Sequence, residues 1–372
     1  MNKLKLKIKL HAEKECRELR YPKLKRSSRK NKKAFSNMVL AKKYIYVKPF
    51  DGMPTNENVK IVEEELPELK NGEYLVEAVY LSVDPYMRAY APNYKIGDTM
   101  IGTQVAKIIQ SKSSKFPVGK YVVGSFGWRT HSIKEDNIPR TQWRVPYIID
   151  IDDGLPLSLA LGILGMPGNT AQLGLLEICK PQSGETVVVS GAAGAVGSTV
   201  GQIAKIKGCR VIGIAGSDEK AQWLRSIGFD AVINYKTDDL RKALAEAAPN
   251  RVDCYFDNVG GETSSIVLQN MNKFGRIAVC GAISGYLSND MADYPKATSV
   301  QRPMISFQLT MRGFLVDQFF DKWDDAIAQN QQWIKEGKLK YRETVYEGFD
   351  NMLNALVGVL KGENTGKAIV KI

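Results

Sequence analysis

The sequence predicts an α/β protein in which a doubly wound parallel sheet is inserted into a β-barrel domain. Residues 165–335 alternate between strand-like and helix-like segments, a pattern typical of a parallel sheet covered by helices. Residues 38–164 hold short strand-like runs separated by glycine and proline, which is typical of a barrel. Residues 336–372 then read as strand, helix and strand. We therefore expect a first domain that is split around a second one.

The expected elements follow from runs of β-branched residues and from helical periodicity. In the first domain, strands are expected at 59–64, 73–80, 102–109 and 121–123, with the final strand, helix and strand at 340–346, 349–360 and 367–372. In the second domain, strands are expected at 187–190, 211–215, 231–234, 252–257, 275–281 and 311–316. Helices are expected there at 199–207, 219–227 and 240–247.

The most informative stretch is the small-residue turn from Gly191 to Gly197, with the sequence Gly-Ala-Ala-Gly-Ala-Val-Gly. It follows a β-branched strand and leads into an amphipathic helical segment. A strand, a glycine-rich turn and a helix form the dinucleotide-binding fingerprint of Rossmann-type sheets, whose helix amino end holds a pyrophosphate. Ala192 replaces the first glycine of the usual pattern. A tight structural turn is the alternative interpretation.

The end of the next strand indicates which dinucleotide is bound. NAD-binding proteins carry an acidic residue there for the ribose 2′-hydroxyl. This chain has Gly216 and Ser217 instead, followed by Lys220 on the opening turn of a helix. A cation favours a 2′-phosphate, which a carboxylate would repel. The sequence thus favours NADP over NAD, although a lysine on a helix is also commonly just solvated.

Composition favours a soluble enzyme without a metal. The hydrophobic fraction is 44% and no apolar run reaches the length of a membrane span. The five cysteines are scattered, which predicts no disulfide framework and a reducing, cytoplasmic setting. They are Cys16, Cys179, Cys209, Cys254 and Cys280. The only histidines are His11 and His131, so no cluster of zinc ligands is expected.

The net charge of +12 is concentrated in residues 1–37, which hold 14 Lys and Arg against three Glu, a net charge of +11. The rest of the chain is nearly neutral, so no nucleic-acid partner is expected for the core. We expect this basic tail to be disordered. It is open to three interpretations: an interaction arm, a mitochondrial transit segment, or an upstream extension without function. The last is favoured because Met38 precedes the first domain-like sequence.

From Met38 to Ile372 the chain resembles the zinc-independent medium-chain dehydrogenase/reductase superfamily, and within it the enone and alkenal double-bond reductases. Seven stretches carry the resemblance in order. They are Ser82-Val-Asp-Pro-Tyr-Met-Arg88, Gly165-Met-Pro-Gly168, Ala192-Ala-Gly-Ala-Val-Gly-Ser198, Gly216-Ser-Asp-Glu-Lys220, Phe256-Asp-Asn-Val-Gly-Gly261, Cys280-Gly-Ala-Ile-Ser284 and Gly362-Glu-Asn-Thr-Gly-Lys367. The chain departs from the family at Gln172 and Leu173, where aromatic residues are usual, which puts the fine substrate preference in question.

The resemblance implies a GroES-like catalytic domain over 38–164 and 336–372 and a Rossmann NADP-binding domain over 165–335. It implies NADPH-dependent reduction of the carbon–carbon double bond of α,β-unsaturated ketones and aldehydes, of the 15-oxoprostaglandin 13-reductase or 2-alkenal reductase type. Two alternatives stay open: a quinone reductase of the same superfamily, and a non-catalytic protein that binds NADPH. A homodimer is also expected, because the edge of the nucleotide sheet is available to pair across a two-fold axis.

The resemblance also assigns residues to roles. The cofactor-binding set is Gly194, Ala195, Val196, Gly197, Lys220, Tyr235, Asn258, Cys280, Gly281, Ala282, Ile283, Ser284, Gly285, Tyr286, Phe314, Leu315, Val316 and Asn364. Tyr286 is the expected catalytic residue, because a phenol beyond a strand end can donate to an enolate oxygen. Tyr86, Phe126 and Trp128 are expected to line an apolar substrate pocket, whereas Met87 reads as core.

Overall fold

The computed structural model describes residues 38–151 and 154–372 of this chain. The predicted basic tail at 1–37 lies outside the described residues. Residues Val39–Ile372 form one compact unit that contains both predicted domains, so the domain boundaries themselves stay a prediction. Within the described ranges, no helix is both long enough and apolar enough to cross a lipid bilayer.

A six-stranded parallel sheet forms one part of this unit, with the strand order β10-β9-β8-β11-β12-β13. Its strands are β8 (Thr186–Ser190), β9 (Arg210–Ala215), β10 (Ala231–Asn234), β11 (Val252–Asp257), β12 (Met271–Val279) and β13 (Thr310–Gly313). All neighbouring pairs are parallel. The chain order reverses between β8 and β11, and in open α/β sheets the ligand crevice lies at the carboxyl ends of such strands.

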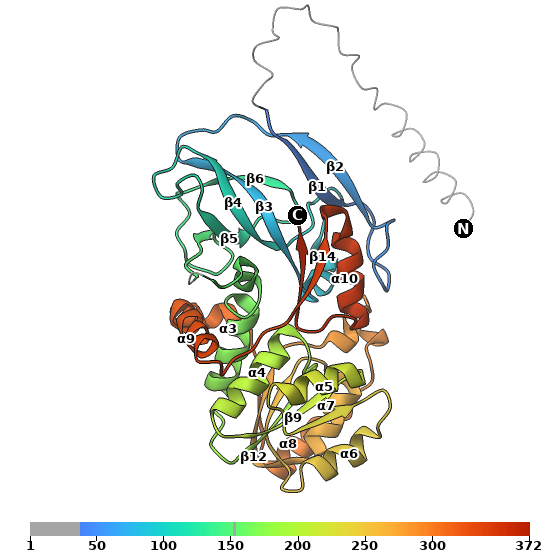
Figure 1. Cartoon of the computed structure of the whole chain (residues 1–372). Helices are drawn as coiled ribbons and strands as arrows, with labels where there is room; N and C mark the ends of the chain where they lie inside the picture. Colours follow the sequence, from blue (N-terminus) through green and yellow to red (C-terminus); the bar gives the residue numbers. More distant parts are fainter. Residues whose placement is uncertain (1–37, 152–153) are drawn as a thin grey trace, which may run out of the picture. The chain divides into compact units, whose positions relative to one another are not determined.

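Helices cover both faces of this sheet, as the sequence predicts (Figure 1). Val187 and Val189 of β8 belong to one buried cluster, while Val188 between them belongs to another on the opposite face. The first cluster includes residues of α4 (Ala195–Ile206) and α5 (Asp218–Ser226). The second includes residues of α6 (Leu240–Ala247) and α7 (Gly261–Gln269). Because side chains alternate across a strand, a buried strand needs cover on both sides.

The barrel-like part is a mostly antiparallel seven-stranded sheet with a separate strand pair, β1 (Leu40–Tyr46) and β2 (Val59–Glu65). Its strands are β3 (Glu73–Val83), β4 (Thr103–Ser111), β5 (Tyr121–Ser125), β6 (His131–Glu135), β7 (Tyr147–Ile148), β14 (Glu343–Glu347) and β15 (Lys367–Lys371). The last strand, β15, pairs antiparallel with β3. The end of the chain therefore joins the sheet of the early strands, and Figure 1 shows β14 and α10 (Met352–Lys361) beside them.

Several elements differ from the sequence prediction. Helix α4 begins at Ala195 instead of residue 199, and β12 and β13 both start and end earlier than expected. The expected helices did not include α2 (Tyr86–Ala89), α3 (Met166–Leu173), α7, α8 (Gln301–Phe307) or α9 (Trp323–Lys335). A π-helical turn, Gly174–Cys179, continues α3. Helix α3 lies against both α4 and α9, so it is apolar on more than one side and lacks a simple amphipathic pattern.

Candidate active site

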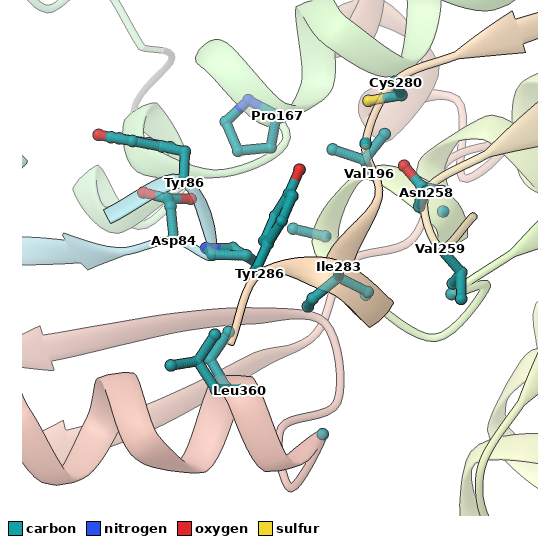
Figure 2. Close-up of a pocket in the computed structure, with 18 of the residues that line it drawn as sticks. Asp84, Tyr86, Pro167, Val196, Asn258, Val259, Cys280, Ile283, Tyr286 and Leu360 are labelled. Atoms are coloured by element: carbon teal, nitrogen blue, oxygen red, sulfur yellow. The ribbon is translucent and has the colours of Figure 1, made fainter. Parts of the chain in front are cut away.

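A cavity of about 730 Å³ opens at the carboxyl ends of β8 and β11, where the strand order reverses. One wall comes from the parallel sheet and its loops, including Gly191, Asn258 and Tyr286. The other comes from the barrel side, including Tyr86 and Leu360. Figure 2 shows Tyr286 in the middle of these side chains. The cavity thus lies where the fold rule for doubly wound sheets places a ligand.

The glycine-rich turn forms one end of the cavity and fits a pyrophosphate. Gly194 precedes the first turn of α4, and no side chain caps that helix end, so its backbone N–H groups are free for an anion. A Cβ at Gly197 would lie 2.4 Å from the Gly191 carbonyl oxygen and 2.8 Å from the Ala192 Cα. These are backbone atoms that cannot move aside, so only glycine keeps the turn this tight. The departure at Ala192 leaves the turn intact.

Two lysines line the cavity: Lys220 beyond the end of β9, where the sequence lacks an acidic residue, and Lys236 beyond the end of the neighbouring β10. Lys220 donates from Nζ to the Gly362 carbonyl at 2.5 Å, and Lys236 lines the same region. Burial lowers the pKa of Lys220, and the nearby charge of Lys236 lowers it further. The neighbouring carboxylate of Asp218 accepts a hydrogen bond from Asn234 at 2.9 Å. Two ammonium groups side by side are the arrangement that an anionic 2′-phosphate stabilises.

A buried carboxylate fixes the loop that follows β11. One oxygen of Asp257 accepts hydrogen bonds from the Ser190 and Tyr255 hydroxyls, at 2.9 and 2.7 Å, and from the Val259 and Gly260 amides. Asn258 donates from its side-chain amide to the Ser190 carbonyl at 2.7 Å. Its own amide oxygen is left for the cavity that Asn258 lines. The bonds tie β8 to β11, so Asn258 is held rigidly at the crevice.

Tyr286, the expected catalytic residue, lines the cavity with a phenol that can donate a hydrogen bond. It follows the short 3₁₀ turn Ile283–Gly285 beyond β12, and its hydroxyl accepts a hydrogen bond from the Ala282 amide at 3.2 Å. Among the described residues no acceptor takes the phenol proton. Burial raises the pKa of Tyr286, and the Ala282 bond only partly opposes that shift. The phenol therefore stays protonated at neutral pH, with its O–H available to a ligand (Figure 2).

The barrel side of the cavity contains a buried ion pair. Lys367 is only 4% exposed, and its Nζ lies 3.1 Å from a carboxylate oxygen of Asp84. The same ammonium donates to the Val83 and Ala368 carbonyls at 2.7 and 2.8 Å. Burial lowers the pKa of Lys367, and Asp84 opposes that effect. Since all three ammonium donors are used, the pair fixes the segment that carries Tyr86.

The structure corrects two of the three residues expected in the substrate pocket. Phe126 and Trp128 are 4% and 0% exposed and do not line the cavity. Trp128 packs edge-on against Tyr44 at 5.3 Å between ring centres and contacts Met87 in a barrel cluster. A small barrel is filled by side chains, and these two aromatics serve that purpose. Tyr86 does line the cavity, and burial raises its pKa, with Asp84 adding to the shift.

Most of the expected cofactor-binding residues line the cavity together, and two do not. Ala282 is not among the lining residues and donates its amide to the Tyr286 hydroxyl, while Gly285 is buried against Tyr294. The lining residues are Gly194, Ala195, Val196, Gly197, Lys220, Tyr235, Asn258, Cys280, Gly281, Ile283, Ser284, Tyr286, Phe314, Leu315, Val316 and Asn364. The departures from the family pattern, Gln172 and Leu173, are buried in α3 outside the cavity, so they alter packing behind the wall.

Other residues that line the cavity were missed by the sequence analysis. Trp143 and Arg144 come from the loop before β7, and Met166, Pro167 and Thr170 from α3. Two of the missed residues lie beside features that could have indicated them. Lys236 follows the predicted cofactor residue Tyr235, and Pro167 belongs to the Gly165-Met-Pro-Gly168 stretch. For the loop at Trp143 there was no local signal, because only the folded barrel brings it to the cavity. Within the described ranges, no cluster of three or more His, Cys, Asp or Glu side chains is arranged to hold a metal.

Comparison with known proteins agrees with this geometry. The family described as "N-terminal domain of oxidoreductase" matches residues 42–140, and "Zinc-binding dehydrogenase" matches residues 195–331. Prostaglandin reductase 1 of Bos taurus is 51% identical, with 90% of this chain and 100% of that protein covered. The 2-alkenal reductase (NADP(+)-dependent) of Nicotiana tabacum is 39% identical over 91% of this chain and 97% of that protein. The crystal structure of CurA from Vibrio vulnificus in complex with NADPH has a TM-score of 0.82 and 37% identity, covering 89% of this chain and 98% of that one.

A doubly wound nucleotide-binding sheet, a barrel domain and a protonated phenol at the strand ends define a nicotinamide-dependent oxidoreductase. The chain belongs to the zinc-independent medium-chain dehydrogenase/reductase family, in the group that contains prostaglandin reductase 1 and the alkenal reductases. The residues present fit NADPH as the cofactor: the uncapped helix end with its crowded glycine turn, and the two lysines where an acid would select NAD.

Proposed function

We propose that this protein reduces the carbon–carbon double bond of α,β-unsaturated ketones and aldehydes with NADPH. The observation that carries the proposal is the Tyr286 phenol, which is protonated, lacks a protein acceptor among the described residues and lies in a cavity that fits NADPH. Relatives named prostaglandin reductase 1 and 2-alkenal reductase (NADP(+)-dependent) support it. The substrate class is of the 15-oxoprostaglandin 13-reductase or 2-alkenal reductase type.

When bound, NADPH supplies a hydride to an electrophilic carbon. In a conjugated carbonyl substrate, reduction at the β-carbon leaves negative charge on the carbonyl oxygen. The Tyr286 O–H, whose oxygen accepts from the Ala282 amide, would donate to that oxygen and stabilise the charge as it develops. The Ala282 amide fixes the phenol oxygen, so little reorganisation is needed when the charge appears.

The remaining cavity residues bind and orient the reactants. Lys220 and Lys236 would hold the 2′-phosphate, and the turn before α4 would hold the pyrophosphate. Near Tyr286 the wall is formed by Pro167, Ile283 and Leu360, which Figure 2 shows around the ring. These apolar side chains limit water around the developing charge, which strengthens the hydrogen bond from the phenol.

The direct test is consumption of NADPH with a 2-alkenal, a 15-oxoprostaglandin and a quinone as separate substrates. We expect turnover with the two unsaturated carbonyl compounds, a product in which the double bond is saturated and the carbonyl retained, and little turnover with NADH. Reduction of the quinone alone would instead assign the protein to the quinone reductases. Binding of NADPH without turnover of any of the three would indicate a non-catalytic NADPH-binding protein.

We also propose a homodimer that pairs through the edge strand β13. This strand lies at one end of the parallel sheet and pairs only with β12 within the described residues. Ile305, an apolar side chain that is 77% exposed, lies close to it in sequence. An unpaired edge strand with apolar neighbours is a surface that a second copy covers well. Light scattering at micromolar concentration should give the mass of two chains, and a single-chain mass would contradict the proposal.

A cytoplasmic location is proposed as well. The four cysteines within the described residues, Cys179, Cys209, Cys254 and Cys280, are free thiols. Cys179 and Cys254 are buried near each other, with the Cys254 thiol 3.5 Å from the Cys179 carbonyl oxygen. Neighbouring cysteines that are not joined in a disulfide fit a reducing compartment. Imaging of the tagged full chain tests this, and accumulation in an organelle or outside the cell would contradict it.

A further inference from the structure

Arg88 is a buried cation whose charge the proposed mechanism does not use. It lies on the one-turn helix α2, which also carries the cavity residue Tyr86, and it is 1% exposed. Burial lowers the pKa of Arg88, yet a guanidinium still stays charged in a protein. None of the carboxylates in the described residues forms an ion pair with it. A buried charge without an acidic partner is costly, and it persists only where its hydrogen bonds compensate for the lost hydration.

The hydrogen bonds of Arg88 join two segments that are far apart in the sequence. Its Nε donates to the Gly52 carbonyl at 3.0 Å. Its Nη2 donates to the Leu287 carbonyl at 2.7 Å and to the Asn289 side-chain oxygen at 3.0 Å. Asn289 in turn donates to the Phe50 carbonyl at 2.6 Å, and the Phe50 ring lies 5.7 Å from the guanidinium. The planar fork of one arginine thus joins residues 50–52 to residues 287–289.

The second of these segments begins immediately after Tyr286. Within the described ranges, the amide of Tyr286 donates to the Ile283 carbonyl at 3.2 Å, and its hydroxyl has one partner, the Ala282 amide. On the side before Tyr286 the loop is bonded to the loop after β11, because the Ile283 and Ser284 amides donate to the Asn258 and Val259 carbonyls at 3.3 and 3.2 Å. Leu287, the next residue, is fixed from the barrel side by Arg88. This bond links the wall that holds Tyr86 to the wall that holds Tyr286.

We infer that Arg88 is a positioning residue for Tyr286: its guanidinium fixes the loop at residues 287–289 against the segment at residues 50–52 and thereby holds the phenol in the cavity. The inference rests on the proposed function, in which Tyr286 is the donor. A residue that acts through Tyr286 loses its influence on turnover when the phenol hydroxyl is absent, whereas a residue that only stabilises the fold does not.

The test is a double-mutant cycle of Arg88→Lys with Tyr286→Phe. Lysine keeps the charge but cannot make the forked set of bonds. We expect Arg88→Lys to lower kcat about tenfold or more in the Tyr286 background, in the range for a misplaced donor, and by less than about threefold in the Tyr286→Phe background. The NADPH Kd from fluorescence titration should change less than about threefold in both. Equal losses in the two backgrounds would overturn the inference.

Arg276→Lys is the matched control. Arg276 also forms a forked set of bonds, with Glu185, which lies just before the amino end of β8, and neither residue lines the cavity. We expect it to lower the melting temperature and to leave kcat and the NADPH Kd unchanged. If Arg88→Lys does not fold, Asn289→Ala, which removes one acceptor of Arg88 on an exposed residue, takes its place in the cycle with a smaller effect in the same direction.

Hydrogen–deuterium exchange of residues 283–289 provides a readout that does not need turnover. We expect exchange there to speed up about tenfold or more in Arg88→Lys and to stay unchanged in Arg276→Lys. Unchanged exchange in Arg88→Lys would contradict the inference even if the protein proves inactive on unsaturated carbonyl compounds. If the wild-type protein reduces unsaturated carbonyl compounds but the losses of kcat from Arg88→Lys and Tyr286→Phe are additive, Arg88 does not act through Tyr286. In that case the proposed reaction still stands.

Discussion

The phenol oxygen of Tyr286 accepts a hydrogen bond from the backbone amide of Ala282, 3.2 Å away. This bond uses the oxygen as an acceptor and leaves the O–H proton for a ligand. Replacing Tyr286 with Phe should therefore lower kcat about ten- to a thousandfold, the range for the loss of one donor or acid in the transition state. The NADPH Kd should stay within about threefold of the wild-type value, because the ring remains. Steady-state turnover and fluorescence titration measure the two, and unchanged turnover would remove Tyr286 from the mechanism.

Gly281 sets how closely the phenol lies over the backbone. A Cβ at this position would lie 3.0 Å from the Tyr286 hydroxyl and 3.3 Å from the Asn258 carbonyl oxygen. Gly281→Ala should displace the hydroxyl by a few tenths of an ångström and lower kcat about tenfold. Gly313→Ala is the control, since a Cβ there meets nothing within 4 Å. Similar kcat values for the two variants would show that the phenol tolerates displacement.

Cofactor selection should depend on Lys220, which follows β9, and Lys236, which follows β10. Lys220→Ala should weaken NADPH binding by about 1.5–3 kcal/mol, the range for a hydrogen bond to a charged group, and should barely affect NADH. Lys236→Ala should act in the same direction but more weakly, because Lys236 is more exposed than Lys220. Lys242→Ala, on the exposed side of α6, is the matched control. Titration with both cofactors measures the effect, and equal weakening of NADPH and NADH would contradict a role in reading the phosphate.

Acid should weaken the bond between the start of β8 and β12. Glu185 accepts two hydrogen bonds from Arg276, at 2.9 and 2.5 Å. Burial alone would raise the pKa of Glu185, but the Arg276 and Gln182 bonds outweigh it and the net pKa is lowered. A carboxyl group whose pKa is lower in the folded state stabilises the fold fully at any pH above its unfolded-state pKa. This stabilisation is lost as the pH falls through the folded-state pKa.

Glu185→Gln should therefore reduce the free energy of unfolding by about 1–3 kcal/mol near neutral pH. The difference between variant and wild type should shrink as the pH falls below 4.5, the ordinary pKa of the carboxyl group. Urea denaturation at a series of pH values measures both effects. A difference that is constant down to acid pH would show that the ionised carboxylate is not what stabilises this contact.

Trp128 should affect stability and not the reaction. It is fully buried in the barrel, and within the described residues its indole N–H has no hydrogen-bond partner, so Trp128→Phe loses packing alone. The expected cost is about 1–3 kcal/mol of unfolding free energy, with KM for a 2-alkenal unchanged. Denaturation and steady-state kinetics check the two together. A large change in KM with native stability would return Trp128 to the substrate pocket.

The sheet and its cofactor turn could be predicted from the sequence because their signals are local. The buried strands β10 and β11 and helix α6 lie at the expected residues, since each is a short apolar run or a clear helical pattern. The helices α3 and α9 were missed. Helix α3 packs against α4 and α9, and burial on several sides blurs its helical pattern. Helix α9 buries a single face, formed by Trp323, Ala326, Asn330 and Trp333, so its helical pattern was present in the sequence and the prediction overlooked it.

The sequence by itself determined the nucleotide-binding turn, the cation that replaces an acid after β9, and the phenol beyond β12. Each of these depends on a few consecutive residues with one chemical role. Only the tertiary structure decided which aromatics face the cavity, because closure of the barrel buries Phe126 and Trp128 and brings the distant loop at Trp143 to the site. It also decided what holds Tyr286: Arg88 lies 199 positions from its acceptor Leu287, and no local pattern reports a contact across that distance.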